Sequence, residues 1–272
     1  MKKCAALLML LCQLLTGCGG TSTDTMTGKI LKIGKADCTI LTTVDAAVMI
    51  DCGEAENIQE ILDALNAMHV QKLDILIITH FDKDHVGGAA EILRTLPVAQ
   101  VVESDYTPDN PASDAYTAYR AALAETGTEV IAVKDTQEFT AGTMQLTIQG
   151  PGEQVYSKNT DNNCSLVVTV THAGNRLLFA GDIEKQRIRD LLNTLQPCDF
   201  LKVPHHGVYN SALPELFSTV SPAYAVITDS GKNPADAETL EALETSGTQI
   251  FETANGTVTV VSTQGGLKVT GG

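Results

Sequence analysis

The chain has 272 residues, 43% of them hydrophobic, and its 33 acidic and 18 basic side chains give a formal net charge of −15. This length and apolar content suffice for one large α/β domain or two small ones, and the weakness of internal linkers favours one. So acidic a surface repels nucleic-acid phosphates and anionic lipid headgroups, which excludes general binding to either unless metal ions or a local basic patch compensate.

The N-terminal segment has the pattern of a secretion signal. Lys2 and Lys3 precede an apolar stretch, residues 5–15, that is too short to cross a membrane as a stable helix. The run Leu15-Thr16-Gly17-Cys18 resembles a bacterial lipoprotein box. It predicts that residues 1–17 are removed and that lipidated Cys18 anchors the protein to the extracytoplasmic face of the bacterial membrane. An ordinary signal peptide is the alternative.

After the signal, the composition predicts a flexible tether at residues 18–27, which are mostly small and polar, and one domain at 28–272. In the domain, short apolar runs alternate with amphipathic helical patterns. Strands are expected two or three times between residues 29 and 52, and at 73–78, 100–103, 129–133, 144–149, 165–170, 176–180, 200–203, 224–228, 249–252 and 257–262. Helices are expected at 58–68, through 92–96, at 116–124, 184–195 and 236–245. This order favours two packed sheets with helices outside.

Four cysteines remain after Cys18, and none has C-x-x-C spacing. Cys38 and Cys52 flank an expected hairpin, so they would face each other and could pair outside the cytoplasm. The alternative is that Cys38, Cys52, Cys164 and Cys198 are four small buried apolar residues.

The most informative string is Ile78-Thr79-His80-Phe81-Asp82-Lys83-Asp84-His85-Val86-Gly87-Gly88, which follows the apolar run 73–78. In an extended loop alternate side chains share a side, so His80, Asp82 and Asp84 can converge, and a bend at Asp84 brings His85 alongside. Two adjacent carboxylates gain from a bound cation, and imidazole with carboxylate suits zinc, manganese or iron. With no cysteine-rich cage nearby, the sequence predicts an open, reactive metal site.

Three further groups of polar side chains follow expected strands. They are Asn163 with Ser165, Asp182 after Gly181, and His205-His206 after Lys202. Each alone is a weak signal, and Asp182 could simply cap the following helix. Their shared position at strand ends, where α/β sites form, favours a common site.

In this order, H-x-D-x-D-H, N-x-S, G-D and H-H-G, the motifs resemble the metallo-β-lactamase superfamily, and specifically the C-terminal hydrolase-like domain of ComEC-type DNA-uptake proteins. The runs Ile33-Gly34-Lys35-Ala36-Asp37-Cys38 and Met49-Ile50-Asp51-Cys52-Gly53 are similar to that group's V-G-Q-G-D-A and L-I-D-T-G. The resemblance covers nearly the whole chain after the signal. It implies an α/β fold, an αββα sandwich of two mixed sheets flanked by helices, with the site along one edge.

The resemblance also implies two divalent metal ions, zinc or manganese. On that basis Asp182 bridges the two ions, His80 and Asp82 serve the first, and Asp84 and His85 serve the second with one of His205 and His206, of which His206 is favoured. Residues implied to act on substrate or to steady the site are Asp84, Asn163, Ser165, Lys202 and His205. The two ions would lower the pKa of a shared water molecule and aim it at phosphorus or at a carbonyl carbon.

Three departures from the family pattern bear on function. Asp82 stands where most members have histidine, Val208 replaces a serine, and Asn233-Pro234 replaces an expected histidine-proline pair. Asp82 argues against lactam hydrolysis, and so does the absence of tryptophan from the chain.

The leading hypothesis is a surface-tethered, metal-dependent phosphodiester hydrolase whose first candidate substrate is extracellular nucleic acid. One alternative is an enzyme acting on phosphorylcholine or teichoic-acid phosphodiesters in a cell-wall polymer, which suits the acidic charge. The other is a non-catalytic binding lipoprotein that keeps the fold. No protein partner is evident from the sequence.

Overall fold

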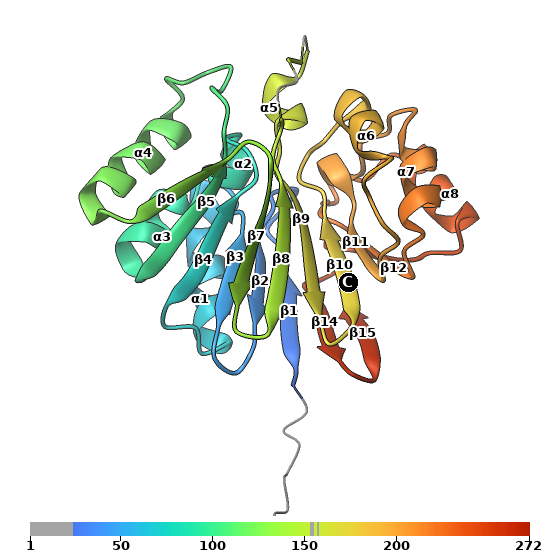
Figure 1. Ribbon diagram of the computed structural model, residues 1–272, viewed down its shortest axis with the longest axis horizontal. Coiled ribbons are helices and arrows are strands. Elements are labelled where there is room, and N and C mark those ends of the chain that lie inside the picture. The colour runs from blue at the N-terminus through green and yellow to red at the C-terminus, as the bar shows by residue number, and fades with distance from the viewer. Residues whose placement is uncertain (1–23, 153–154, 157) are drawn as a thin grey trace, which may run out of the picture.

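The computed structural model describes residues 24–152, 155–156 and 158–272, so the predicted signal segment and Cys18 lie outside it. One layer of the molecule is an eight-stranded sheet in the order β15-β14-β1-β2-β3-β4-β5-β6 (Figure 1). The pairs from β15 to β3 are antiparallel, and those from β3 to β6 are parallel. Its strands are β1 (Met26–Ile30), β2 (Thr39–Thr42), β3 (Ala47–Ile50), β4 (Leu73–Ile78), β5 (Val98–Ser104), β6 (Glu129–Val133), β14 (Val258–Thr263) and β15 (Gly266–Gly271).

The second sheet has seven strands in the order β13-β12-β11-β10-β9-β8-β7. It too is mixed, because the pairs from β13 to β10 are parallel and those from β10 to β7 are antiparallel. Its strands are β7 (Thr136–Ala141), β8 (Met144–Gln149), β9 (Val167–His172), β10 (Asn175–Phe179), β11 (Phe200–Lys202), β12 (Tyr224–Ile227) and β13 (Gln249–Glu252).

The core fills the space between the two sheets, and a second apolar layer covers each outer face. Val48, Ile77, Val168 and Phe179 are among the buried side chains that meet between the sheets. The helices outside the first sheet are α1 (Ile58–Ala67), α3 (Ala89–Thr95) and α4 (Asp114–Thr126). Those outside the second are α6 (Lys185–Leu191), α7 (Leu213–Val220) and α8 (Ala237–Thr245). The predicted αββα sandwich of two mixed sheets is therefore confirmed.

All the parallel strands end at the same edge of the sandwich, at the top of Figure 1. Short elements lie at that edge, namely η1 (Ala55–Asn57), α2 (Lys83–Val86), α5 (Thr160–Asn163) and η2 (Pro204–Gly207). The opposite end of the sandwich consists of tight turns between antiparallel strands. The polar side chains that follow β3, β4, β10 and β11 therefore lie close together at this edge.

Two strands, β7 and β15, and the helical elements η1, α2, α5, η2 and α7 were absent from the sequence prediction. Exposed polar residues alternate along β7 (TQEFTA), and β15 both begins and ends with glycine, so neither has a strong apolar run. The helix α6 ends at Leu191, four residues earlier than predicted. Among the described residues, no helix is both long and apolar enough to span a bilayer.

Of the two possibilities for Cys38 and Cys52, a disulfide or buried free thiols, the structure shows the second. Cys38, Cys52, Cys164 and Cys198 are all free and buried, which is the alternative reading. Burial raises the pKa of the Cys38 and Cys52 thiols well above the usual range, and nearby Asp51 adds to the effect. These thiols therefore behave as small core side chains.

Candidate metal centre

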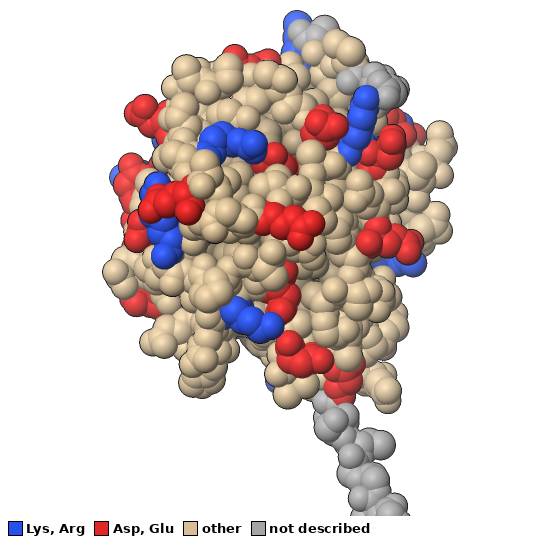
Figure 2. Space-filling model, turned by 60° about the vertical axis from the view of Figure 1, so that its left-hand side comes forward, with Lys and Arg blue, Asp and Glu red and all other residues tan. Residues whose placement is uncertain are grey.

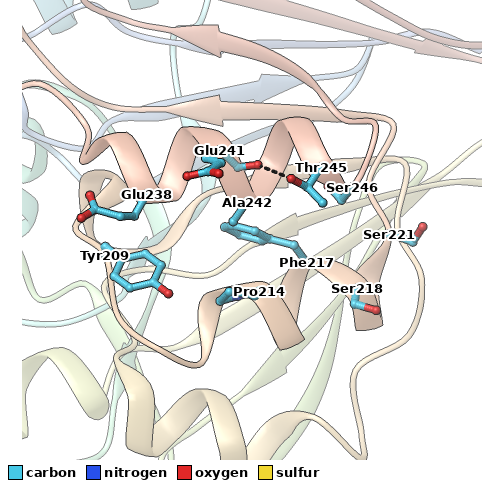
Figure 3. A pocket seen from close by; sticks show the side chains of 10 residues that line it. All are labelled: Tyr209, Pro214, Phe217, Ser218, Ser221, Glu238, Glu241, Ala242, Thr245 and Ser246. Carbon is cyan, nitrogen blue, oxygen red and sulfur yellow. Dashed lines mark hydrogen bonds between the residues drawn. The ribbon is translucent and has the colours of Figure 1, made fainter.

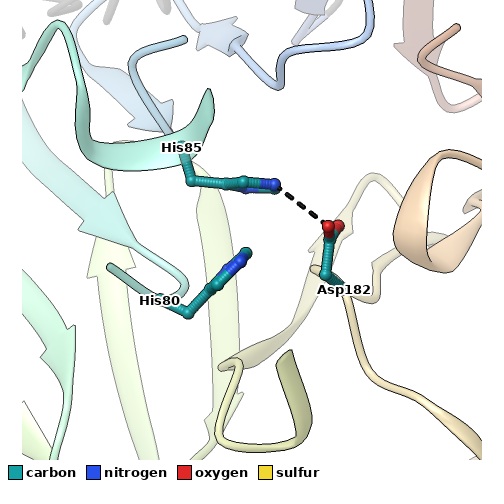
Figure 4. A group of neighbouring side chains, drawn as sticks. All are labelled: His80, His85 and Asp182. Carbon is teal, nitrogen blue, oxygen red and sulfur yellow. Dashed lines mark ion pairs between the residues drawn. The ribbon is translucent and has the colours of Figure 1, made fainter. Parts of the chain in front are cut away.

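The loop that follows β4 delivers two buried imidazoles to the common edge. β4 is an apolar strand whose last residues are fully buried, and α2 begins four residues after Thr79, at Lys83. His80 lies in the loop and His85 in α2, and neither ring is exposed to solvent. Figure 4 shows both side chains pointing toward Asp182, which comes from the second sheet. The ring centroids of His80 and His85 are 4.1 Å apart.

His85 is held by Asp51, the residue after β3. Its Nδ1 lies 2.8 Å from Oδ2 of Asp51, and that carboxylate also accepts hydrogen bonds from the Thr79 hydroxyl (2.7 Å) and backbone N–H (2.8 Å). Because a carboxylate can only accept, Nδ1 carries the proton. Nε2 is left with a lone pair that is free to bind a metal. This Nε2 lies 3.3 Å from Oδ2 of Asp182. A carboxylate that fixes a histidine in this way is typical of metal ligands.

His206 reaches the same point from the second sheet. Its Nδ1 lies 3.2 Å from the carbonyl oxygen of Thr228, so Nδ1 is again the protonated nitrogen. Its Nε2 lies 3.1 Å from Oδ2 of Asp182 and 3.6 Å from Oδ2 of Asp84. The backbone here is unusual, because His205, His206 and Gly207 all have positive φ, at 48°, 52° and 78°. Non-glycine residues in that region are strained, and such strain is concentrated at functional sites.

Asp182 follows β10 and is 3% exposed. Its backbone N–H donates to the Ser165 hydroxyl (3.1 Å), and the preceding Gly181 has φ +53°. Burial alone would raise the pKa of Asp182, but His206, His85 and Lys202 hold it well below its usual range. The carboxylate is therefore ionised at the centre of the cluster.

Lys202 and Asp37 form an ion pair on the inner side of the cluster, and both are buried. Nζ of Lys202 also lies 3.6 Å from Oδ1 of Asp182, while Oδ1 of Asp37 lies 3.5 Å from Nδ1 of His206. Burial opposes the charge on Lys202, but Asp37 and Asp182 outweigh it and raise the pKa of Lys202. The pair as a whole is neutral, but its ammonium group places a fixed positive charge beside Asp182.

The surrounding carboxylates favour the protonated forms of His85 and His206. Burial would lower the pKa of His85, but Asp182 and the carboxylates around it raise that pKa well above the usual value. The pKa of His206 rises to about 9 for the same reason, with burial again opposed chiefly by Asp182. A site that stabilises protons on buried imidazoles will also stabilise a metal cation that replaces them.

The donor atoms fit a metal centre. Among the described residues, the buried Nε2 atoms of His80, His85 and His206 and Oδ1 of Asp182 have no hydrogen-bond partner. An orphaned buried polar atom is costly, so such atoms are expected to meet a ligand. Four overlapping groups have ligand atoms within 4.8 Å of one another: His80, His85 and Asp182; Asp84, His85 and His206; Asp37, Asp51 and His85; and Asp37, Asp182 and His206.

The structure brings most of the predicted ligands together but not Asp82. Asp84, His85 and His206, predicted to share one ion, form one of the four groups. Asp82 precedes α2 with its side chain 46% exposed, and its Oδ2 lies 3.7 Å from Nε2 of His80. It belongs to none of the groups found among the described residues, so its role as a ligand stays a prediction.

The other predicted residues occupy distinct places around the cluster. The Asn163 side chain accepts from the backbone N–H of Glu184 and of Arg187 and donates to the carbonyls of Lys158 and Asn159. It therefore ties the segment that follows Asp182 to the loop at residues 158–159. His205 is partly exposed at the rim. Its Nδ1 lies 3.5 Å from Oε1 of Glu184, and its Nε2 lies 3.5 Å from the amide nitrogen of Asn162.

Sequence reasoning assigned no role in the site to Asp37 or Asp51. Both stood in the quoted motifs, and Asp51 directly follows an apolar strand, which is the same signal that identified Asp182. Asp37 offered no such signal, since its partners Lys202 and His206 belong to the other sheet.

A pocket of about 550 Å³, separate from the metal-ligating groups, lies between α7 and α8 (Figure 3). Tyr209, Glu238 and Glu241 are on its wall, and no residue of the four metal-ligating groups lines it. Size alone therefore does not identify the site in this molecule, whereas the convergence of donor atoms does.

Comparison with known proteins gives a consistent result. The model of the Metallo-beta-lactamase superfamily matches residues 32–227. ComE operon protein 3 of Bacillus subtilis is 29% identical over 171 residues, which are 62% of this chain and 21% of that protein. Recombination protein 2 of Haemophilus influenzae is 25% identical over 236 residues, or 85% of this chain and 28% of that protein.

The chain thus spans less than a third of the length of either curated relative. Among solved structures, the metallo-beta-lactamase fold protein YhfI from Bacillus subtilis has a TM-score of 0.57 at 13% identity. The match covers 84% of this chain and 96% of that one. A likeness at this identity establishes the fold. The two curated relatives agree with the predicted resemblance to the ComEC-type branch.

Proposed function

Because this chain belongs to the metallo-beta-lactamase superfamily, we propose that it is a metal-dependent hydrolase that cleaves phosphodiesters. The observation that carries the proposal is the convergence on Asp182 of two buried, unpartnered imidazole nitrogens, those of His85 and His206, with His80 beside them. Paired divalent ions in such a site are used for in-line displacement at phosphorus.

Of the residues in these groups, His80 and Asp182 would hold one ion, and Asp84, His85 and His206 would hold the other. His85 would serve a single ion, because Asp51 occupies its Nδ1 and only Nε2 is free. Zinc or manganese bound there would supply Lewis acidity toward a phosphoryl oxygen. Two such ions would also balance the buried carboxylates, which Lys202 and Lys35 only partly neutralise.

The chain's own groups would then position these ligands and the substrate. Asp51 keeps the proton of His85 on Nδ1, and Lys202 with Asp37 steadies Asp182 from beneath. His205 is the imidazole at the rim, where Glu184 and Asn162 hold its two nitrogens. We assign to His205 a hydrogen bond from Nε2 to a substrate oxygen, which would take the place of Asn162, because among the cluster's histidines His205 is the one that reaches solvent.

We place the protein on the extracytoplasmic face of the membrane, tethered through lipidated Cys18, on the strength of the sequence Leu15-Thr16-Gly17-Cys18. The first candidate substrate is extracellular nucleic acid, supported by the ComEC-type relatives. In Figure 2, acidic and basic side chains are interspersed on the visible face and no broad basic patch is present. A nucleic acid would therefore be held mainly at the metal centre.

The acidity of the rim favours a second candidate substrate. Three carboxylates form this rim: Asp82 lies beside His80, Glu184 lies beside His205, and Asp161 lies near Asp82. Burial and the charge of Asp82 raise the pKa of Asp161. Such a rim repels a long polyanion and attracts a cation. A choline phosphoester, such as one in a cell-wall polymer, combines a phosphodiester with a positive headgroup and suits this charge.

The proposal is tested by a substrate panel run with metal replacement. The mature protein, loaded with zinc or manganese, is assayed on bis-p-nitrophenyl phosphate, single-stranded DNA and choline phosphoesters. Asp84→Asn and Asp182→Asn should each abolish hydrolysis while the circular dichroism spectrum is unchanged. Asp63→Asn is the matched control, because Asp63 is exposed on α1, away from the site. Failure to bind metal in stoichiometric amount, or full activity in either site variant, would refute the proposal.

A further inference from the structure

The first described residue is fastened to the end of the sandwich opposite the metal centre. One carboxylate oxygen of Asp24 accepts a hydrogen bond from the Thr143 hydroxyl (2.9 Å), and the other lies 3.2 Å from Nε2 of His172. Thr143 is in the β7–β8 turn, and His172 is the last residue of β9. The point at which the chain enters the domain is therefore fixed by two contacts.

This fastening is part of a buried polar cluster that joins the two sheets. Nδ1 of His172 lies 2.9 Å from the hydroxyl of Ser262, and the Asn175 amide donates to that hydroxyl (2.9 Å). Ser262 belongs to β14 in the first sheet, whereas His172 and Asn175 belong to the second. Since His172 is 1% exposed, Asp24 is bound to a rigid support.

The surface around Asp24, here called the turn pole, is formed by four turns between antiparallel strands. It consists of the turns at residues 43–46, 142–143, 173–174 and 264–265. These turns contain a single carboxylate, Asp45, which accepts a hydrogen bond from the Thr43 hydroxyl. Val44 projects from the pole with 99% of its surface exposed. The four turns thus present an exposed apolar side chain and a single carboxylate at the end where the chain enters the domain.

The metal centre lies at the other end of the same strands. β9 runs from Val167, next to the site residue Ser165, to His172 at the turn pole. Six residues in a strand extend about 20 Å at about 3.3 Å each. Between Cys18 and Asp24, the chain can reach at most about 20 Å in any conformation. An anchor at Cys18 therefore holds Asp24, and with it this end of the domain, within about 20 Å of the bilayer.

We propose that the turn pole faces the phospholipid bilayer that carries the Cys18 anchor, and that the metal centre opens away from it. The inference rests on the proposed lipid anchor. It also narrows the substrate class, because headgroups of the anchoring membrane lie at the wrong end of the molecule. The substrate is then a phosphodiester in solution or in a polymer that extends outward from the membrane.

The orientation is tested with the full-length lipoprotein, isolated from membranes and reconstituted in vesicles whose lipids carry nitroxide headgroups. A fluorophore is attached at Val44→Cys, on the turn pole, or at Asn110→Cys, on an exposed loop at the metal-centre edge. The native cysteines of the described chain are buried and do not compete for labelling. Vesicles without nitroxide provide the unquenched reference for each variant.

The proposal predicts loss of most of the emission at residue 44 and retention of the emission at residue 110. Equal quenching at both sites, or stronger quenching at residue 110, would overturn it. Recovery of the protein free of vesicles would also overturn it, since there would be no anchor to set an orientation. Hydrolysis of bis-p-nitrophenyl phosphate is measured on the same samples, so that a failed orientation with intact activity is distinguished from a failed hydrolase assignment.

Discussion

Replacing Gly181 by alanine tests whether the close approach of β10 to the Ser165 loop positions Asp182. Gly181 has φ +53°, and an added Cβ would lie 2.8 Å from Cβ and 3.1 Å from Oγ of Ser165. The left-handed backbone costs an alanine about 1–2 kcal/mol, partly offset by about 0.4–1 kcal/mol from the lower entropy of the unfolded chain. Overpacking against Ser165 adds about 1–3 kcal/mol. The free energy of unfolding should therefore fall by about 2–4 kcal/mol.

Gly174→Ala is the matched control for this change. Gly174 also has positive φ, +88°, but an added Cβ there would meet no atom within 4 Å. Gly174→Ala incurs the cost of the left-handed backbone without overpacking. Its free energy of unfolding should therefore fall by about 1 kcal/mol or less. Urea unfolding of the metal-free proteins measures both values, and equal losses would refute the steric reasoning. Because Ser165 also accepts the Asp182 N–H, only Gly181→Ala should weaken zinc binding, measured by competition with a chromophoric chelator.

Three further predictions concern the cluster itself. Asp51→Asn removes the carboxylate that fixes His85, so zinc should bind about 10–100-fold more weakly in a chelator competition; unchanged affinity would contradict the assignment. Lys202→Met leaves Asp37 charged and buried, and urea unfolding should show a loss of about 3–5 kcal/mol that Asp37→Asn largely restores in the double variant. Because the pKa of His206 is raised to about 9 in the metal-free protein, metal must displace a proton below that pH. Zinc affinity should therefore increase as the pH rises toward about 9, with protons released into a weakly buffered indicator solution; a pH-independent affinity would exclude this competition.

The fold was accessible from the sequence where burial leaves a simple pattern. The apolar run at 73–78, interrupted only by the partly buried Asp74, is a strand covered on both faces, and its exact bounds follow from that run. β15 could not be found in the same way, because glycine occupies both of its ends and its side chains are largely exposed. α7 was missed because it has only eight residues and carries proline near its start.

The candidate site was predictable in its composition but not in its connections. His80 and His85 are close in sequence, so their proximity needs only a turn. Alternation along an extended loop predicted that Asp82 would share their side, but α2 begins at Lys83 and leaves Asp82 facing partly outward. The contact of Asp37 with Lys202 depends on how the two sheets are stacked, which no local pattern records.

The pairing of β1 has a consequence for the order in which the domain can form. β1 lies between β2 and β14, so one of its edges has no partner until nearly the last residues have been synthesised. Ser262, which completes the buried cluster beneath Asp24, arrives with the same strand. Until β14 has been synthesised, the antiparallel half of the first sheet therefore lacks the pairing of β1 with β14. The last segment to emerge completes the domain.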